Sequence, residues 1–289
     1  MSPMYMNKLI VIFLLVCLAA SLASCSIGLR LRYDDGQKYE AGEFRDLQGI
    51  RILDVDWVSG SVHVITDNVS GISATESSGK KIPSELVMRY WVDGDTLRIR
   101  FGKDGARLRN NFQKDLVITV PEKILFSETS FDSASADIIY PKINAGILEI
   151  SSASGSVEAE GIAKEIRLET VSGVVRAEFS GFDSAQFNTV SGNIDCLMLT
   201  QGSVRIDSVS GDIHANMTGV PDVKAETVSG SVTLSMQEGT GFTAKLSSLS
   251  GKIAIDFPYN QSGDQYVSGD GTGDIKVSTT SGDITLMKG

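Results

Sequence analysis

The most constraining feature of this 289-residue chain is a Ser-Gly pair that recurs at an almost fixed interval. Between Ser154 and Ser229 the successive serine numbers differ by 18, 19, 19 and 19 residues. A period of this length is typical of a solenoid, in which each repeat forms one coil and neighbouring coils bury a shared core. The pairs expected at the corners of the coils are Ser154 and Gly155, Ser172 and Gly173, Ser191 and Gly192, Ser210 and Gly211, Ser229 and Gly230, Ser250 and Gly251, and Ser281 and Gly282.

Each repeat predicts two strands with a bend between them. Counted from the serine, positions −6 and −4 are apolar before the pair, and positions +3 and +5 are apolar after it. Position −4 holds Leu168, Phe187 and Ile206 in successive repeats. Alternating positions share one face of a strand, so we expect these columns to line one continuous core.

The corner residues have a physical reason to be small and polar. Glycine reaches positive φ and lets neighbouring backbones approach closely, so Gly192→Val is predicted to destabilise the coil locally. Position −2 always carries a hydroxyl, and we interpret this column as a ladder of hydrogen bonds along the stack. Its members are Ser152, Thr170, Thr189, Ser208, Thr227, Ser248 and Thr279.

Two neighbouring outward columns carry charges of mostly opposite sign. Position −5 is mostly basic, with Arg167, Arg205 and Lys224 among its members, and position −3 is partly acidic, with Asp207 and Glu226. Exposed pairs of this kind contribute about 0 to 1 kcal/mol each. The pattern favours a solvated, charge-balanced sheet face, and the alternative is a stripe that binds a partner.

The ends of the chain depart from the regular repeat. An isolated early copy covers residues 53–64, whereas residues 65–125 keep strand character without the rhythm and include a hairpin around Asp93 and Gly94. Ser250 and Ser281 are 31 residues apart, and we interpret the excess, residues 259–274, as a polar loop that leaves the solenoid. Both irregular parts are expected to cap the stack, because open strand edges invite assembly.

The fold class is therefore all-β: a single-stranded β-solenoid, like a β-helix, with repeats of about 19 residues and an irregular N-terminal part. The solenoid domain is predicted over residues 49–289, with irregular strands over 65–125 and regular repeats over 126–289. Residues 25–48 suit a spacer or an initial strand.

The N-terminus predicts export. Residues 1–24 read as a signal peptide, with one charge at Lys8 followed by a short apolar run and small residues. The stretch ending in Ser24 and Cys25 resembles a bacterial lipobox, which implies a lipid on Cys25 and cleavage before it; a soluble secreted protein is the alternative. Two or more acyl chains would hold the protein stably at a membrane. Position 26 is Ser and not the aspartate associated with retention in the inner membrane, which favours an outer membrane if the cell has one. Otherwise we expect the outer face of the cytoplasmic membrane.

The set of sequence motifs, in this order along the chain, resembles a known family. With the lipobox, the hairpin at residues 93–99, the alternating strand 116–121, the Ser-Gly repeats and the closing segment 279–284, the chain is similar to the bacterial putative-adhesin β-solenoid family, a domain of unknown function. The resemblance covers about residues 50–289. It implies a cell-envelope protein, often anchored in a membrane, and it brings no catalytic or ligand residues.

The sequence offers little material for catalysis. Its two histidines, His63 and His214, lie at outward positions far apart in the chain, and no phosphate-binding loop or Cys-x-x-Cys occurs. A polysaccharide-active enzyme would need acids such as Asp207, Asp212 and Glu226 to converge in one cleft. The loop 268–274 has few carboxylates for Ca²⁺. No cofactor or metal is expected.

The composition limits which classes of partner the protein can bind. The net charge of −10 argues against nucleic acid. Cys196 is left without a disulfide partner at an inward position. We therefore expect a non-enzymatic, lipid-anchored envelope protein that holds an unknown protein or glycan on its sheet faces, with self-association left open. The alternatives are a polysaccharide-active enzyme or an accessory protein in envelope-stress signalling.

Overall fold

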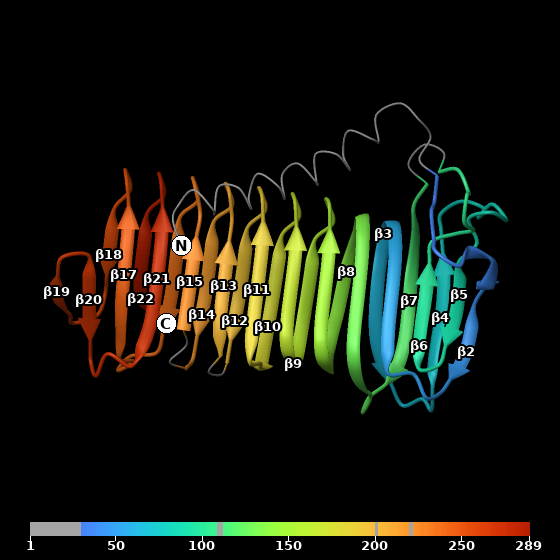
Figure 1. Ribbon diagram of the computed structural model, residues 1–289, viewed down its shortest axis with the longest axis horizontal. Helices are drawn as coiled ribbons and strands as arrows, with labels where there is room; N and C mark the ends of the chain where they lie inside the picture. The colour runs from blue at the N-terminus through green and yellow to red at the C-terminus, as the bar shows by residue number, and fades with distance from the viewer. Residues whose placement is uncertain (1–29, 109–111, 200–201, 220–221) are drawn as a thin grey trace.

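The computed structural model describes residues 30–108, 112–199, 202–219 and 222–289, which form an elongated stack of coils (Figure 1). The expected signal peptide and Cys25 lie outside the described residues. Within the described ranges, no helix is long and apolar enough to cross a membrane. The prediction of an all-β solenoid is confirmed.

The elements of the first half include one short 3-10 helix and two very long strands. They are η1 (Gly36–Lys38), β1 (Glu40–Ala41), β2 (Phe44–Leu47), β3 (Ile52–Asp67), β4 (Ile72–Ser77), β5 (Arg89–Asp93), β6 (Thr96–Arg100), β7 (Lys114–Pro121), β8 (Leu125–Ser152) and β9 (Val157–Thr170).

The second half consists of short strands, two to a coil, and a hairpin. They are β10 (Val175–Gly181), β11 (Ser184–Thr189), β12 (Ile194–Met198), β13 (Ser203–Asp207), β14 (Ile213–Met217), β15 (Asp222–Glu226), β16 (Val232–Met236), β17 (Phe242–Ser248), β18 (Ile253–Ile255), β19 (Asn260–Ser262), β20 (Gln265–Ser268), β21 (Gly273–Thr279) and β22 (Ile284–Lys288).

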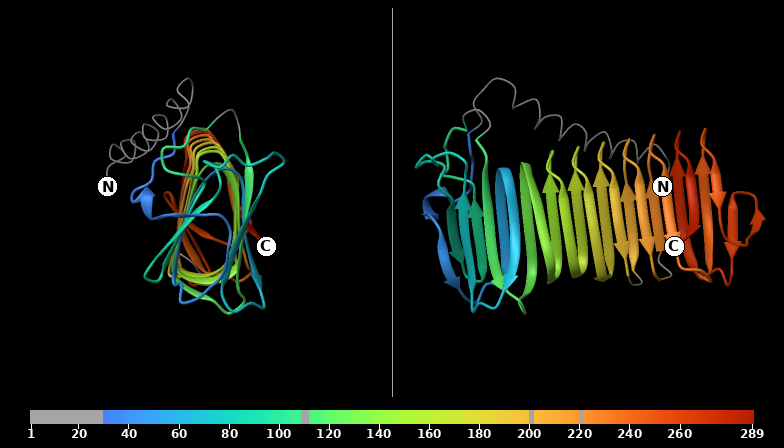
Figure 2. Two further views of the ribbon diagram at one scale, coloured as in Figure 1. Left: turned by 90° about the vertical axis from the view of Figure 1, so that its right-hand side faces the viewer. Right: turned by 180° about the vertical axis from the view of Figure 1, so that it is seen from behind.

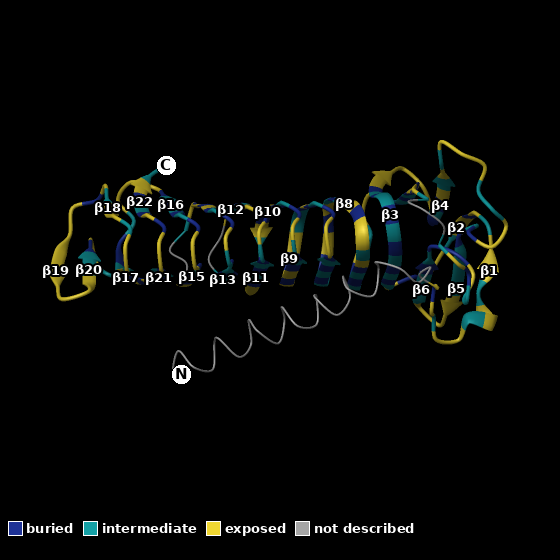
Figure 3. Ribbon diagram, turned by 90° about the horizontal axis from the view of Figure 1, so that it is seen from above, coloured by how far each residue is buried: buried dark blue, intermediate teal, exposed yellow. Residues whose placement is uncertain are grey.

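The coils form two facing sheets, seen end-on in Figure 2 and from above in Figure 3. The front sheet, towards the viewer in Figure 1, holds the strands that precede the corners, including β11, β13, β15, β21 and β17. The rear sheet holds the strands that follow the corners, including β10, β12, β14, β16, β22 and β18. All of these neighbours pair in parallel and in register, because each repeat carries the same alternating apolar positions.

The core runs along the whole stack between the two sheets. Leu168, Phe187 and Ile206 are fully buried and belong to a single hydrophobic cluster, as predicted. Its columns alternate with outward positions along every regular strand, so a one-residue shift in register would expose a whole column. The repeat pattern is therefore also the pattern of core contacts.

The corner glycines are required for close approach between coils. A Cβ on Gly192 would lie 1.7 Å from the carbonyl oxygen of Gly173, and the same contact recurs at the other corners. The expectation that these glycines need positive φ is wrong, because positive φ occurs at Gly60 but at none of the repeat corners. The carbonyl of the coil below leaves no room for a side chain.

The buried hydroxyl column fixes the corner within each coil. The Thr170 hydroxyl accepts the Gly173 N–H at 3.0 Å and donates to the carbonyl of Gly155, in the neighbouring coil, at 3.2 Å. The first bond recurs in all seven Ser-Gly corners. The predicted ladder thus runs through glycine backbone groups and not from hydroxyl to hydroxyl.

At the N-terminal end, β3 lies inside the stack and not at its edge. It pairs in parallel with β8 on one side and with β6 and β7 on the other, so β6 and β7 form the outermost coil. The antiparallel strands β5 and β4 then cover β6 and β7, and β1 and β2 pair with β5 and β4. Residues 30–47, within the segment for which a spacer or an initial strand is expected, thus pack onto this end, where Leu31 and Phe44 are buried.

At the C-terminal end, the spatial order of the coils differs from their order in the chain. The last strands, β21 and β22, are inserted between β15 and β16 on one side and β17 and β18 on the other. The expectation of a loop that leaves the solenoid is wrong, because β19 and β20 form a hairpin and β20 pairs antiparallel with β17. Figure 1 shows this hairpin at the end of the stack.

Candidate functional site

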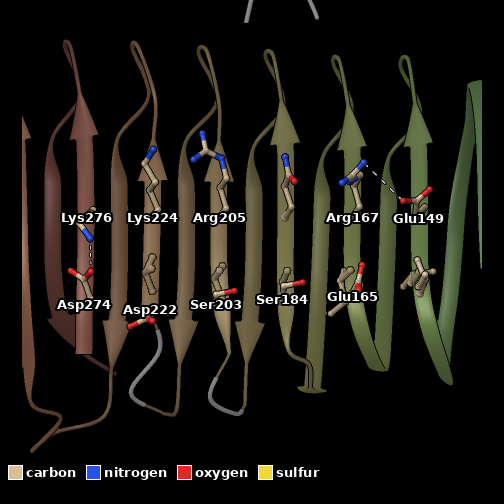
Figure 4. A pocket seen from close by; sticks show the side chains of 17 residues that line it. Glu149, Glu165, Arg167, Ser184, Ser203, Arg205, Asp222, Lys224, Asp274 and Lys276 are labelled. Carbon is tan, nitrogen blue, oxygen red and sulfur yellow. Dashed lines mark hydrogen bonds and ion pairs between the residues drawn. The ribbon is translucent and has the colours of Figure 1, made fainter. Parts of the chain in front are cut away.

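The outer surface of the front sheet carries a groove of about 340 Å³ that crosses six coils. It follows positions −7 to −5 of successive repeats, from residues 147–149 on β8 to Asp274 and Lys276 on β21 (Figure 4). The inserted strand β21 places Lys276 next to Lys224, which comes 52 residues earlier in the chain, from the difference of their numbers. The groove therefore reaches its sixth coil only because the C-terminal coil returns into the stack.

The groove is lined by rows of charged and polar side chains beside apolar ones, and it has no net charge. Its upper row in Figure 4 holds Arg167, Arg205, Lys224 and Lys276, and its lower row holds Glu165, Asp222 and Asp274 with the serines of β11 and β13. Glu149 completes four acids against four bases. The lining has no aromatic side chain, so a partner would be held by hydrogen bonds and charge pairs and not by ring stacking.

The charged columns pair with each other as the sequence predicts. The Arg205 guanidinium contacts Asp207 at 2.6 Å on its own strand and Glu226 at 3.3 Å on the next. Lys224 also contacts Glu226, at 3.0 Å. Burial raises the pKa of Asp207 against the lowering effect of Arg205. These contacts support the interpretation of the face as charge-balanced, with its cations already engaged.

The three acids of the enzyme hypothesis do not converge. Asp207 and Glu226 lie opposite each other on β13 and β15. Asp212 follows the Ser-Gly corner, and its carboxylate accepts the Ser231 N–H at 2.8 Å. Asp207 and Glu226 both pair with Arg205, and Asp212 accepts a backbone hydrogen bond at the next corner. Among the described residues, these three acids therefore do not have the geometry of a paired catalytic acid and base.

The other residues singled out in the sequence have structural or exposed positions. The His214 Nδ1 lies 3.2 Å from Asp195 on the open rear face. Asp270 bonds Thr272 within its own turn, and Asp274 pairs with Lys276. Cys196 is buried in the core, and burial raises the pKa of its thiol to about 12. Across the described ranges, no group of three or more acidic, His or Cys side chains could hold a metal.

A polar cluster on the front sheet near the N-terminal end was not predicted. Arg100 makes a bidentate contact with Asp54, at 2.7 and 2.9 Å, and Arg98 contacts the same carboxylate at 2.6 Å. Burial opposes ionisation of Asp54, but the two guanidinium groups outweigh it and lower its pKa. The rings of Tyr33 and Tyr39 lie over Arg100. This N-terminal cluster clamps residues 33–39 onto the sheet.

A buried ion pair closes the core at the same end. The Lys114 ammonium is fully buried, pairs with Glu76, and donates to the carbonyl of Leu86 at 2.5 Å. It also lies 4.5 Å from the ring centroids of both Trp57 and Phe101. Burial lowers the pKa of Lys114 to about 8, and Glu76 opposes the shift. A charge placed inside an end coil disfavours continuation of the stack.

Sequence reasoning could have found part of this site. Lys114 shares the parity of Leu116, Ile118 and Val120, all buried, so strict alternation predicts that its side chain points inward. Its partner Glu76, and the partners of Arg98 and Arg100, depend on long-range pairings that no local pattern specifies.

Comparison with known proteins addresses the fold. No curated protein matches the chain. A solved structure of a "putative cell adhesion protein" from Clostridium sporogenes is 14% identical, with 87% of this chain and 100% of that chain covered and a TM-score of 0.28. A "putative adhesin" from Bacteroides fragilis is 15% identical, with 89% and 99% covered and a TM-score of 0.42. The family described as Toastrack DUF4097 matches residues 50–287, so this chain belongs to that family.

Proposed function

We propose that the protein is a lipid-anchored, non-enzymatic scaffold of the cell envelope that holds a protein or glycan partner in the groove of its front sheet. The observation that supports this most is the groove itself, which repeats the same polar positions over six coils. A repeated surface of this kind suits an extended partner with a regular spacing, because neighbouring strands lie about 4.8 Å apart.

Anchoring would set the orientation of the molecule. Between Cys25 and Arg30, the first described residue, five residue steps span at most about 18 Å. Lipid on Cys25 would therefore keep the N-terminal end near the membrane. The hairpin of β19 and β20 lies at the opposite end of the stack (Figure 1).

The anchor is tested by replacing Cys25 with Ser and fractionating the cells. We expect the wild-type chain in the membrane fraction and the variant in the soluble fraction, because the variant cannot be acylated. Equal membrane retention of the two proteins would contradict anchoring through Cys25.

Partner binding is tested by charge reversal in the groove. Lys224→Glu changes one half-buried groove cation, and Arg176→Glu, on the outer surface of the rear sheet, is the control. We expect envelope material captured by the wild-type protein to be lost with the first variant and kept with the second. Equal capture by both variants would remove the groove from the proposal.

A further inference from the structure

The two sheets end differently at the C-terminal end of the stack. In the front sheet, β17 is covered by β20. In the rear sheet, β18 pairs with β22, and the described residues supply no strand for its other edge. Ile253 is 36% exposed and Ile255 is half-buried, whereas Val232 and Leu234, at the same positions in an internal coil, are fully buried. The rear sheet therefore ends in an open, partly apolar strand edge.

The free edge presents the backbone groups of two residues. The carbonyl of Lys252 accepts from Ile284, and the N–H of Asp256 donates to Leu286, so both groups face β22. Backbone direction alternates along a strand, so the N–H and C=O groups of Ile253 and Ile255 face away from β22. These four groups are available to a further strand.

The sequence of this edge is complementary to itself in the antiparallel direction. If Ala254 of one chain lies opposite Ala254 of another, Ile253 faces Ile255 and Lys252 faces Asp256. The opposed isoleucines then have the backbone groups that face outward, which suits a hydrogen-bonded pair. Lys252 and Asp256 are both exposed, and each would meet an opposite charge twice in the symmetric contact. Register, hydrogen bonding and charge all agree on the same arrangement.

We propose that β18 pairs antiparallel with β18 of a second copy of this chain, about a two-fold axis through Ala254. The pairing continues the rear sheet from one molecule into the next and covers Ile253 and Ile255. The hairpin of β19 and β20 extends the front sheet beyond β17, so the two solenoids meet at an angle and not in a straight line. This inference does not depend on the groove or on its partner.

The contact is small, and it is suited to molecules that are held together by other means. Interfaces well below the usual size are weak and transient in solution. Tethering to a surface raises the effective concentration of one copy near another, so a weak contact can be populated there. The dimer should therefore be sought in intact membranes.

A cysteine on the proposed axis tests the register directly. Opposed residues of the pair that is not hydrogen-bonded have Cα atoms about 4.5 Å apart, within the range of a disulfide. We expect the full chain carrying Ala254→Cys to form a disulfide-linked dimer in oxidised cells, on a non-reducing gel. Thr285→Cys, on the neighbouring strand β22, is the matched control, and the wild-type chain gives the background from Cys25 and Cys196. A dimer yield for Ala254→Cys no greater than these controls would overturn the proposal.

Charge exchange tests the partner across the axis. In the Ala254→Cys chain, Lys252→Glu or Asp256→Lys alone places like charges opposite each other, and we expect about tenfold less dimer, equivalent to about 1.4 kcal/mol. Co-expression of the two variants with different tags should restore a mixed dimer, because each acid then faces a base. Unchanged dimer in either single variant, or no preference for the mixed dimer, would overturn this register.

Discussion

The two ends of the stack cover their open strand edges to different extents. At the N-terminal end, antiparallel strands cover both sheets, β5 on β6 and β4 on β7, and the Lys114–Glu76 pair closes the core. At the C-terminal end, β20 covers the front sheet alone, and β18 keeps an open edge. One end is built to stop pairing, and the other is closed on one sheet only.

Both ends nevertheless use the same device before they are capped. At the N-terminal end, β6 and β7 form the outermost coil, and β3, which precedes them in the chain, lies one coil inside it. At the C-terminal end, β17 and β18 form the outermost coil, and β21 and β22, which follow them in the chain, lie one coil inside it. Each inserted coil pairs on both sides. The ends therefore depend on non-local contacts, whereas the middle depends on contacts between consecutive repeats.

The largest expected effect comes from removing the inserted C-terminal coil. Deleting residues 273–289 removes four buried apolar side chains, Ile275, Val277, Ile284 and Leu286. At about 1.5–3 kcal/mol each, the loss approaches the whole stability of an ordinary domain. We expect hydrogen exchange to lose protection over residues 222–255, while residues 147–198 stay protected.

The matched deletion at the other end is residues 30–47, which carry the outermost strands β1 and β2 and two buried apolar side chains, Leu31 and Phe44. It should cost less, because these strands pair on one side only. Persistent protection of residues 242–255 after the C-terminal deletion would contradict the inserted order of the coils.

The second effect concerns the buried ion pair. Glu76→Ala leaves the Lys114 ammonium buried without its partner, so we expect the free energy of unfolding in urea to fall by about 3–5 kcal/mol. The double variant Glu76→Leu with Lys114→Met removes both charges and should recover most of that loss. If the double variant is as unstable as the single one, shape and not charge holds this end.

The third effect lies in the middle of the stack. Gly192→Val places a side chain against the Gly173 carbonyl, so the coils must separate, and we expect a loss of about 3 kcal/mol in the free energy of unfolding. Gly79→Ala is the control, because a Cβ there meets nothing within 4 Å and the backbone φ is not positive. Equal melting temperatures for the two variants would show that the corners tolerate side chains.

The contrast between middle and ends also explains how much could be predicted. Leu168, Phe187 and Ile206 fall into one core because their spacing is local and repeated, so a period in the sequence becomes a column in space. The place of β21 between β15 and β17 could not be predicted, because no local pattern in the sequence specifies which coils it pairs with. The C-terminal end of the groove could not be predicted either, since Lys276 lies there only because β21 is inserted between β15 and β17. Lys114 could have been predicted to point inward, but its partner Glu76 could not.

A smaller effect concerns Asp56 in the N-terminal half. Burial raises its pKa to about 6 against the effect of Arg100, with Asp132 and Asp54 adding to the rise. Between about pH 4 and pH 6 the folded protein binds more protons at this site than the unfolded chain, so stability falls as pH rises through this window. Asp56→Asn should therefore raise the free energy of unfolding by about 1 kcal/mol at pH 7, because solvent screens part of the full shift.

The same substitution should give almost no gain near pH 3, where Asp56 is largely protonated in both the folded and the unfolded state. Chemical unfolding of the wild type and the variant at the two pH values measures the difference. Asp93→Asn, at the exposed end of β5, is the control. A gain that does not change with pH would show that Asp56 acts through packing.

The smallest expected effect is that of Ile253→Ala, and comparing it with Leu116→Ala distinguishes the two outer coils. Leu116 on β7 and Ile253 on β18 hold the same inward position of the outermost coils, but Leu116 is fully buried under β4 and Ile253 is partly exposed. Leu116→Ala should cost about 2–5 kcal/mol, whereas Ile253→Ala in the monomer should cost less than about 1 kcal/mol. Thermal unfolding of dilute protein without its lipid measures both. A large loss for Ile253→Ala would mean that the rear sheet is closed at its end, and the open edge on which the proposed pairing depends would not exist.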